Sequence, residues 1–125
     1  MKLNQLLAAI LCFTVLTPLL VVTLPVTPAS AASCACITSE AQPQRGQKNR
    51  SSGNFSTQGC TTTLRWSAPD GVSFNVMRDV SGGKDPVELQ NVTNGSSTQN
   101  PNQRSLYIAN PKGANKGFQV CAENT

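Results

Sequence analysis

Carboxylates are the side chains of this 125-residue chain that could carry acid–base chemistry, because the sequence contains no histidine. Two carboxylates on either side of a glycosidic bond can hydrolyse it. The candidates for such a small extracellular hydrolase are Asp70, Asp79, Asp85 and Glu88. Asp70 lies in a Pro-Asp-Gly turn and Asp85 precedes a proline, and at both places an aspartate commonly closes a turn. Without histidine there is no ordinary general base near neutral pH and no serine or cysteine triad. We therefore predict no enzyme activity and no catalytic residue.

The cysteines are the second group with a chemistry of their own. Cys12 lies in an apolar leader that we expect to be removed, and the remaining four are Cys34, Cys36, Cys60 and Cys121. Four cysteines in a small exported domain are typical of two structural disulfides. A zinc site is disfavoured, because Cys34-x-Cys36 does not match metal-ligand spacing and no histidine is available. A thiol-redox protein that uses Cys34 and Cys36 stays an alternative. We expect neither a metal nor a cofactor.

Side-chain alternation restricts how the cysteines pair. Successive side chains of a strand point to opposite faces. Cys60 shares a face with the apolar residues of its predicted strand, whereas Cys121 lies on the face opposite those of its own strand. A bond between Cys60 and Cys121 would join an inward and an outward side chain. We favour the two connectivities that link Cys34 and Cys36 to Cys60 and Cys121.

The first 31 residues have the pattern of a secretory signal peptide. A positive start at Lys2 precedes an apolar run, and Ala29-Ser30-Ala31 matches a cleavage site. A retained membrane anchor is disfavoured by Pro18, and a lipoprotein signal lacks a large aliphatic residue three positions before Cys34. Cleavage leaves 94 of the 125 residues, enough for one small domain. We expect a secreted, extracellular or periplasmic protein with no membrane span after cleavage.

The positive charge of the mature chain gathers in QPQRGQKNR, residues 42–50. No aromatic residue alternates with these charges, so we expect no nucleic-acid binding. Gln, Arg, Ser, Asn, Gly and Pro dominate residues 41–58, and such a composition cannot bury enough apolar surface to order itself. Residues 32–59 are therefore predicted to form a polar flexible amino-terminal arm that carries Cys34-x-Cys36.

Residues 60–125 alternate polar and apolar side chains with the period of a β-strand. The predicted strands lie around residues 61–66, 74–78, 87–89, 106–108 and 118–122. Turn and loop residues separate them, notably at 81–86, 93–103 and 110–117. No window shows helical spacing with caps. The sequence predicts an all-β sandwich-like domain with a core that includes Leu64, Trp66, Phe74, Val76, Phe118 and Val120.

Two segments resemble a known family. TLRWSAPDGVSFNVMRD, residues 63–79, resembles the paired second and third strands of a fibronectin type III domain, and GFQVCAEN, residues 117–124, resembles its sixth strand. The resemblance implies a small immunoglobulin-like or fibronectin type III-like sandwich. That family has a further strand after the sixth, so the sandwich is expected to be incomplete, with a sheet edge beside FQVCA. We expect the amino-terminal segment to fill this edge, with a partner molecule as the alternative.

The exposed residues of this scaffold define the candidate contacts. Tyr107 falls on the outer face of its predicted strand and is our candidate for a ligand contact. In a eukaryotic secretory pathway, the Asn-x-Ser/Thr sequons would make glycosylation sites of Asn49, Asn54, Asn91 and Asn94. We predict a secreted binding or structural module. It would recognise a protein or glycan at the cell surface or outside the cell through loops 81–86 and 93–103, or through the edge beside Cys121.

Overall fold

The computed structural model describes residue 23 and residues 32–125, so the predicted signal peptide lies, apart from residue 23, outside the described residues. The described part contains seven β-strands and no helix, which confirms the all-β prediction. No helix there could cross a bilayer. The strands are β1 (Ser33–Ser39), β2 (Thr63–Ser67), β3 (Ser73–Arg78), β4 (Val87–Thr93), β5 (Ser97–Gln99), β6 (Leu106–Lys112) and β7 (Phe118–Asn124).

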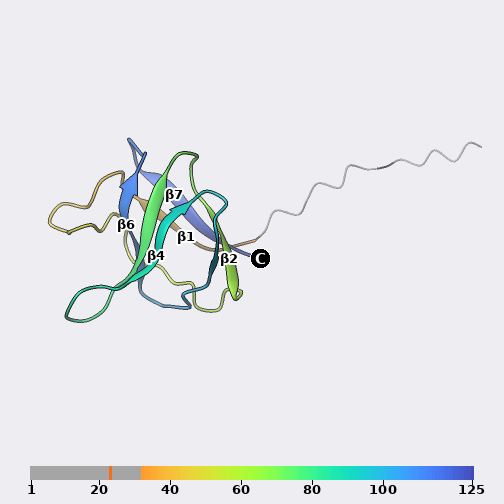
Figure 1. Ribbon diagram of the computed structural model, residues 1–125, viewed down its shortest axis with the longest axis horizontal. Helices are drawn as coiled ribbons and strands as arrows, with labels where there is room; N and C mark the ends of the chain where they lie inside the picture. The colour runs from red at the N-terminus through yellow and green to blue at the C-terminus, as the bar shows by residue number, and fades with distance from the viewer. Residues whose placement is uncertain (1–22, 24–31) are drawn as a thin grey trace, which may run out of the picture.

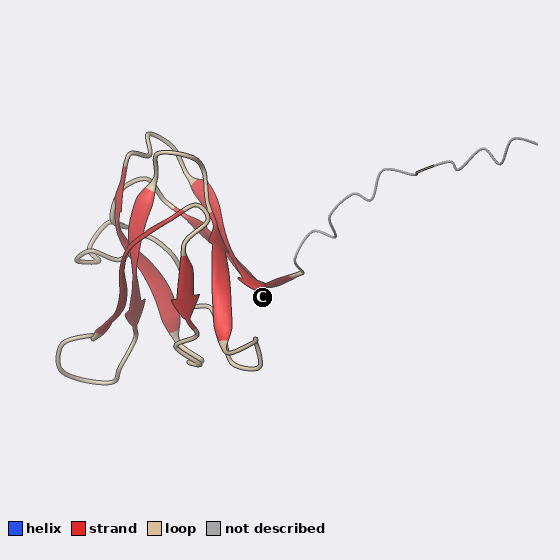
Figure 2. Cartoon of the chain, turned by 45° about the vertical axis from the view of Figure 1, so that its right-hand side comes forward, coloured by secondary structure: helices blue, strands red, loops and turns tan. Residues whose placement is uncertain are grey.

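The strands form two antiparallel sheets that make a small sandwich (Figures 1 and 2). One sheet has the strand order β1-β7-β2-β5 and the other β4-β3-β6. Apolar side chains of both sheets meet in one core. Its buried members are Leu64, Trp66, Val72, Phe74, Val76, Val92, Leu106, Ile108, Phe118, Val120 and Ala122. The six residues predicted for the core are all among them, because period-two alternation directs them to the same side of their strands.

Residues 68–72 carry the chain from one sheet to the other. The Pro-Asp-Gly turn ends β2, and Gly71 adopts a φ of +79°, a conformation that side chains disfavour. The N–H of Val72 donates to the carbonyl of Pro69 at 3.2 Å and closes the turn. β2 and β3 therefore lie in different sheets and are not hydrogen-bonded neighbours.

β7 occupies the interior of the four-stranded sheet, between β1 and β2. Ile37 of β1 lies opposite Val120, and Trp66 of β2 lies opposite Ala122. The amino-terminal segment thus fills the edge beside FQVCA, as expected. In chain order the segment that resembles the family's sixth strand forms the seventh strand here, β7, and β6 precedes it next to β3 in the other sheet.

Two edge regions were missed by sequence reasoning because their side chains are polar. The predicted loop 93–103 contains β5, which pairs with β2 through the backbone. The predicted turn 110–117 begins later, because residues 110–112 continue β6. At an edge, backbone hydrogen bonds to one neighbour can hold a strand without an apolar face, so alternation gives no signal there.

The prediction of a flexible arm over residues 32–59 also needs correction. Its first part is β1, and residues 50–57, here called the covering segment, run along the outer edge of β6. Phe55 and Leu106 exchange both backbone hydrogen bonds, at 2.8 and 2.9 Å, and the N–H of Ser51 donates to Ile108 at 2.8 Å. The side chains of Ser51, Ser52 and Thr57 are buried. Backbone pairing to β6 orders this polar stretch, and within residues 32–59 it is the loop 41–49 that projects from the sandwich (Figure 1).

Trp66 tests this account of the core. Its side chain is 1% exposed, packs edge-on against Phe55 and Phe74, and donates from Nε1 to Thr98 of β5 at 2.8 Å. Trp66→Ala is expected to lower the free energy of unfolding by about 3–5 kcal/mol, because the cavity cannot fully collapse. Thr98→Val should cost about 1–3 kcal/mol by leaving Nε1 without an acceptor.

Urea unfolding followed by far-ultraviolet circular dichroism measures both effects. Since Trp66 is the single tryptophan of the chain, the wild-type emission should also be that of a shielded indole. An emission spectrum of a hydrated indole in the native protein would contradict this packing.

Candidate functional site

Tyr107 lies on the outer face of the three-stranded sheet, in the edge strand β6. It points away from the main core and packs with Met77 and Ala109 in a second apolar cluster. The predicted face is confirmed, but Tyr107 is only 4% exposed and cannot offer an open ring to a ligand. The covering segment and the loop 79–86 bury it, and sequence alternation could not reveal that cover. A ligand contact through Tyr107 stays a prediction, since the residue lines the hollow described below.

A polar network fastens the covering segment over Tyr107. The guanidinium of Arg50 lies 3.9 Å from the centroid of the Tyr107 ring, within the range of a cation–π contact. Arg50 also pairs with Asp79 at 2.9 Å and donates to Oδ1 of Asn54 at 2.6 Å. The amide of Asn54 donates to Asp79 at 2.9 Å. These hydrogen bonds, first from Asn54 and then from Arg50, lower the pKa of Asp79 below its ordinary value of 3.8.

Asp85 fastens the loop 79–86 to the same tyrosine. The Tyr107 hydroxyl donates to Oδ2 of Asp85 at 2.7 Å, and the N–H of Val80 donates to Oδ1 at 3.0 Å. Burial raises the pKa of Tyr107 to about 12, and the hydrogen bond and negative charge of Asp85 add to the shift. Asp85 is thus a structural residue of the loop, as its Asp-Pro context predicts.

A hollow of about 320 Å³ lies beside this network and is called here the lysine hollow. Its lining consists of Lys48, Asn49, Met77, Gly83, Lys84, Asp85 and Tyr107. The volume lies at the lower end of the range of about 300–1,000 Å³ for small-molecule sites. The side chains of Lys48 and Lys84 are exposed, and neither takes part in an ion pair within residues 32–125.

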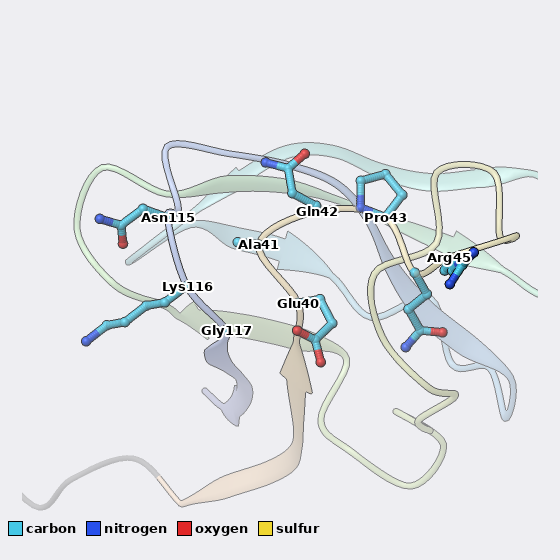
Figure 3. Close-up of a pocket in the computed structure, with 9 residues that line it drawn as sticks. Glu40, Ala41, Gln42, Pro43, Arg45, Asn115, Lys116 and Gly117 are labelled. Atoms are coloured by element: carbon cyan, nitrogen blue, oxygen red, sulfur yellow. The ribbon is translucent and has the colours of Figure 1, made fainter.

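A second hollow of about 500 Å³ lies on the other side of the loop 41–49 and is called the amide hollow. It is formed where β1 ends and where the turn before β7 passes (Figure 3). Its lining consists of Glu40, Ala41, Gln42, Pro43, Gln44, Arg45, Asn115, Lys116 and Gly117. The turn is placed by a close backbone approach: a Cβ on Gly113 would clash with the carbonyl oxygen of Gly71.

Residues of the loop 41–49 line both hollows, and the loop together with the two hollows is called here the loop surface. It presents the cations Arg45, Lys48, Lys84 and Lys116, none of which is ion-paired in the described part of the chain. Its carboxylates are Glu40 and Asp85, and Asp85 already accepts two hydrogen bonds. Sequence reasoning found the charge of residues 42–50 but missed Lys84 and Lys116, because only folding brings these distant positions to the same loop.

The candidate catalytic carboxylates each have a structural partner. Asp70 accepts from the amide of Asn94 at 3.0 Å, and Glu88 pairs with Arg78 at 3.1 Å. Asp79 and Asp85 hold the two sides of the Tyr107 network as described. Within the described residues, no group of three His, Cys, Asp or Glu side chains could hold a metal ion.

The four sequon asparagines differ in how free their side chains are. The amides of Asn54 and Asn94 donate to Asp79 and Asp70. Asn49 and Asn91 are exposed, both with positive φ, and their side chains form no hydrogen bond among residues 32–125. Attachment of a sugar to Asn54 would break the bond to Asp79, whereas Asn49 and Asn91 could be modified without that loss.

Two disulfides connect the amino-terminal strand to the rest of the sandwich. Cys36 of β1 bonds to Cys121, its direct cross-strand neighbour in β7, and Cys34 bonds to Cys60. This connectivity is one of the two that were favoured. Cys60 packs against the core, as alternation predicts, and Cys36 of β1 is exposed.

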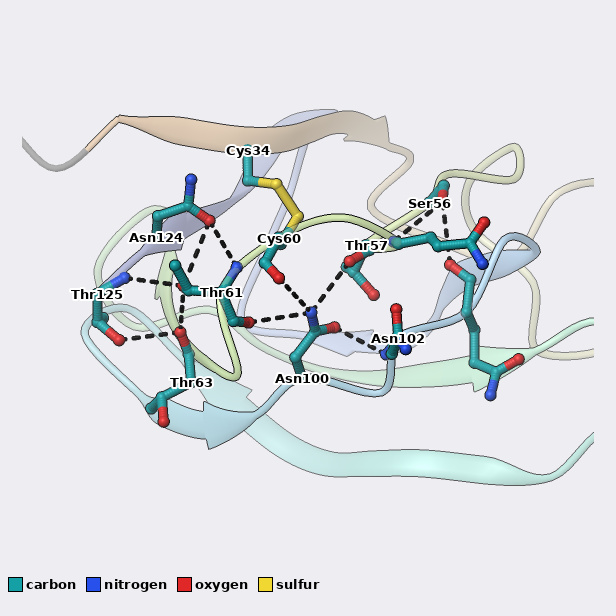
Figure 4. The surroundings of a disulfide bond; sticks show 12 residues. Cys34, Ser56, Thr57, Cys60, Thr61, Thr63, Asn100, Asn102, Asn124 and Thr125 are labelled. Carbon is teal, nitrogen blue, oxygen red and sulfur yellow. Dashed lines mark hydrogen bonds between the residues drawn. A yellow bond between two sulfur atoms is a disulfide. The ribbon is translucent and has the colours of Figure 1, made fainter.

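The Cys34–Cys60 bond sits in a dense polar cluster (Figure 4). The amide nitrogen of Asn100 approaches the carbonyls of Thr57 and Thr61 at 3.0 Å and that of Cys60 at 3.4 Å. The cluster holds the end of the covering segment in place. The two disulfides leave no free thiol among the four cysteines of residues 32–125.

The chain is thus a small, doubly disulfide-bonded β-sandwich with a basic loop surface. No protein-family model, no curated protein and no solved structure matches it.

The Tyr107 network predicts an unusual alkaline titration. A raised pKa means that the folded protein favours the neutral phenol. This contribution to stability is complete below the ordinary pKa of 10.0 and is lost as the pH rises through about 12. Tyr107 is the single tyrosine, so absorbance of tyrosinate should show one native transition near pH 12 and one near pH 10 in denaturant. Asp85→Asn should lower the native value. A native transition near pH 10 would rule out the burial described.

Removal of the disulfides tests the anchoring of β1. The loops closed by Cys36–Cys121 and Cys34–Cys60 span 85 and 26 residues, which in the chain-entropy account correspond to about 4.6 and about 3.5 kcal/mol. We expect Cys36→Ser/Cys121→Ser to destabilise the protein more than Cys34→Ser/Cys60→Ser. Thermal unfolding of both double variants measures the order. A smaller loss for the Cys36/Cys121 pair would show that the hydrogen bonds of β1 alone secure the edge.

Proposed function

We propose that the mature protein is a secreted, non-enzymatic binding module that recognises a partner outside the cell through its loop surface. The observation that carries this proposal is the placement of four cations without ion-pair partners around two hollows of one rigid sandwich. Binding residues are commonly found on loops that a rigid scaffold positions. Of the surfaces named from the sequence, the loop 81–86 is retained, because Gly83, Lys84 and Asp85 line the lysine hollow. The edge beside Cys121 is dropped, because β1 covers it.

Rigid walls support a binding role for this surface. The Arg50 and Asp85 contacts to Tyr107 fix both sides of the lysine hollow, so a ligand need not order these loops when it binds. Such preorganisation lowers the entropic cost of association. The signal-peptide pattern of residues 1–31 supports export, and the two disulfides are typical of an oxidising compartment.

We also propose an immunoglobulin-like or fibronectin type III-like relationship for the sandwich. Its support is the L-x-W strand, the turn and the aromatic-x-Val-x-Arg strand, which cross from one sheet to the other as β2 and β3. Because β7 lies between β1 and β2, the sheet edge beside it is closed, and the loop surface is left as the place for recognition.

The two alternative functions considered from the sequence, a hydrolase and a thiol-redox protein, receive less support. A hydrolase needs carboxylates that are free to transfer protons, whereas Asp79 and Asp85 hold the network over Tyr107. A thiol-redox role for Cys34 and Cys36 would need these residues to bond with each other, and each is bonded to a distant cysteine instead.

A binding assay on the extracellular material of the producing cells tests the proposal. Labelled mature protein, residues 32–125, is expected to be retained saturably. The variant Arg45→Gln/Lys48→Gln/Lys84→Gln/Lys116→Gln should lose at least about tenfold in affinity, since each tenfold step corresponds to about 1.4 kcal/mol. The four replaced side chains are exposed and make no hydrogen bond in the described structure, so the variant should keep the fold. Circular dichroism checks this.

Removal of an equal amount of charge elsewhere provides the control. The quadruple variant Arg65→Gln/Arg78→Gln/Arg104→Gln/Lys112→Gln should bind within about twofold of the wild type if the site and not the net charge decides. Equal losses in both quadruple variants, or no saturable retention of the wild type, would contradict the proposal.

A further inference from the structure

We infer that the loop surface binds a linear acidic polysaccharide, with anionic groups of the polymer held by the cation pairs of the two hollows. This inference rests on the proposed function and names the chemical class of the partner. The lysine hollow contributes Lys48 and Lys84, and the amide hollow contributes Arg45 and Lys116. The loop 41–49 separates the two pairs.

The distribution of charge points to an anionic ligand. Residues 32–125 contain nine basic and six acidic side chains. Of the four free cations on the loop surface, none is matched by a carboxylate partner, while Arg50 and Arg78 are paired with Asp79 and Glu88. Of the two carboxylates of the surface, Asp85 is occupied by Tyr107 and Val80, and Glu40 is outnumbered by Arg45 and Lys116 in the amide hollow. A ligand carboxylate or sulfate would therefore meet ammonium and guanidinium groups that are free to donate.

The loop surface offers no large exposed apolar side chain among the described residues, and this favours a glycan over a protein as the partner. Protein interfaces depend on a few aromatic or apolar anchor residues that become fully desolvated. Among the described residues, Val87 is the large exposed hydrophobic side chain, and it lies on β4 outside both hollows. The amide hollow presents Gln42, Gln44 and Asn115 instead. Amide groups both donate and accept hydrogen bonds, which suits the hydroxyl groups of sugars.

The burial of Tyr107 favours a glycan over a nucleic acid as the ligand of the loop surface. Single-stranded nucleic acids need aromatic rings on which bases can stack. The Tyr107 ring is covered by Arg50 and by the loop 79–86 and is only 4% exposed, and no other aromatic residue lines either hollow.

The paired arrangement points to a polymer rather than a single acidic sugar. Each exposed cation gains little from one anion, because water and salt screen the charge. Two cation pairs on one rigid body can engage successive anionic units of the same chain, and the second contact is then intramolecular. A repeating acidic glycan meets this requirement, whereas an isolated monosaccharide reaches one hollow at a time.

The experiment measures binding of mature protein to four immobilised probes by biolayer interferometry. Polygalacturonate carries carboxylates, dextran sulfate carries sulfates, dextran is the neutral control and single-stranded DNA is the polyanion with bases. We expect binding to one or both acidic polysaccharides, weakening as salt is raised, and none to dextran. Polygalacturonate and dextran sulfate together distinguish carboxylate from sulfate recognition.

Paired variants locate the contact. Lys48→Gln/Lys84→Gln and Arg45→Gln/Lys116→Gln should each weaken polysaccharide binding by at least about tenfold if both hollows hold the same chain. The matched control Arg65→Gln/Lys112→Gln removes the same charge outside the hollows and should stay within about twofold. A galacturonate monomer should bind far more weakly than the polymer, as two-site engagement requires.

Three results would overturn the inference: no binding to either acidic polysaccharide, binding to DNA at least as tight, or equal losses in the control variant. Suppose that either of the first two results occurred while retention in extracellular material still depended on the loop surface. The proposed function would then stand, with another class of partner. Acidic-polysaccharide binding combined with retention that ignores the loop variants would instead reject the proposed function.

Discussion

The pairing of β1 with β7 is the interaction on which the rest of the structure depends. β7 supplies Phe118, Val120 and Ala122 to the core, and without β1 it would form an open sheet edge. β1 closes this edge with a backbone ladder and with the Cys36–Cys121 bond between directly opposed residues. After β1 the chain forms the loop 41–49 and then runs along β6 as the covering segment. A displaced β1 would therefore release the covering segment as well as the edge.

The covering segment converts this edge pairing into a site. Its backbone joins β6, its Arg50 lies on Tyr107, and its end is fixed by Cys60 and the Asn100 cluster. β1 anchors one end of the loop 41–49 and the covering segment anchors the other. The loop therefore projects beside the two hollows in a defined position. The polar composition that suggested flexibility is compatible with order, because backbone hydrogen bonds to β6 and the Cys34–Cys60 bond hold this segment.

Particular residues show where sequence reasoning succeeded and where it failed. Leu64, Trp66, Phe74 and Val76 were placed correctly, because alternation in a half-buried strand follows directly from backbone geometry. The same parity argument disfavoured a Cys60–Cys121 bond and left two connectivities, of which the structure has one. β5 escaped notice, because a polar edge strand has no alternation to detect, and its identity depends on β2 lying beside it. For Tyr107 the sequence predicted the correct face of the strand but not the burial of the side chain. The residues that bury it lie 22 and 57 positions away in the sequence.

The sequence by itself determined five of the seven strands, their inward and outward faces, the disulfide-bearing character and the concentration of charge in residues 42–50. These properties depend on composition and on neighbours a few positions apart. Tertiary structure alone decided that β7 lies between β1 and β2, that the covering segment adds to β6, and that Lys84 and Lys116 join the charged loop. The physical reason is that backbone pairing between distant segments is not specific to side-chain type, so the final neighbours are selected only when the whole core and both disulfides are satisfied together.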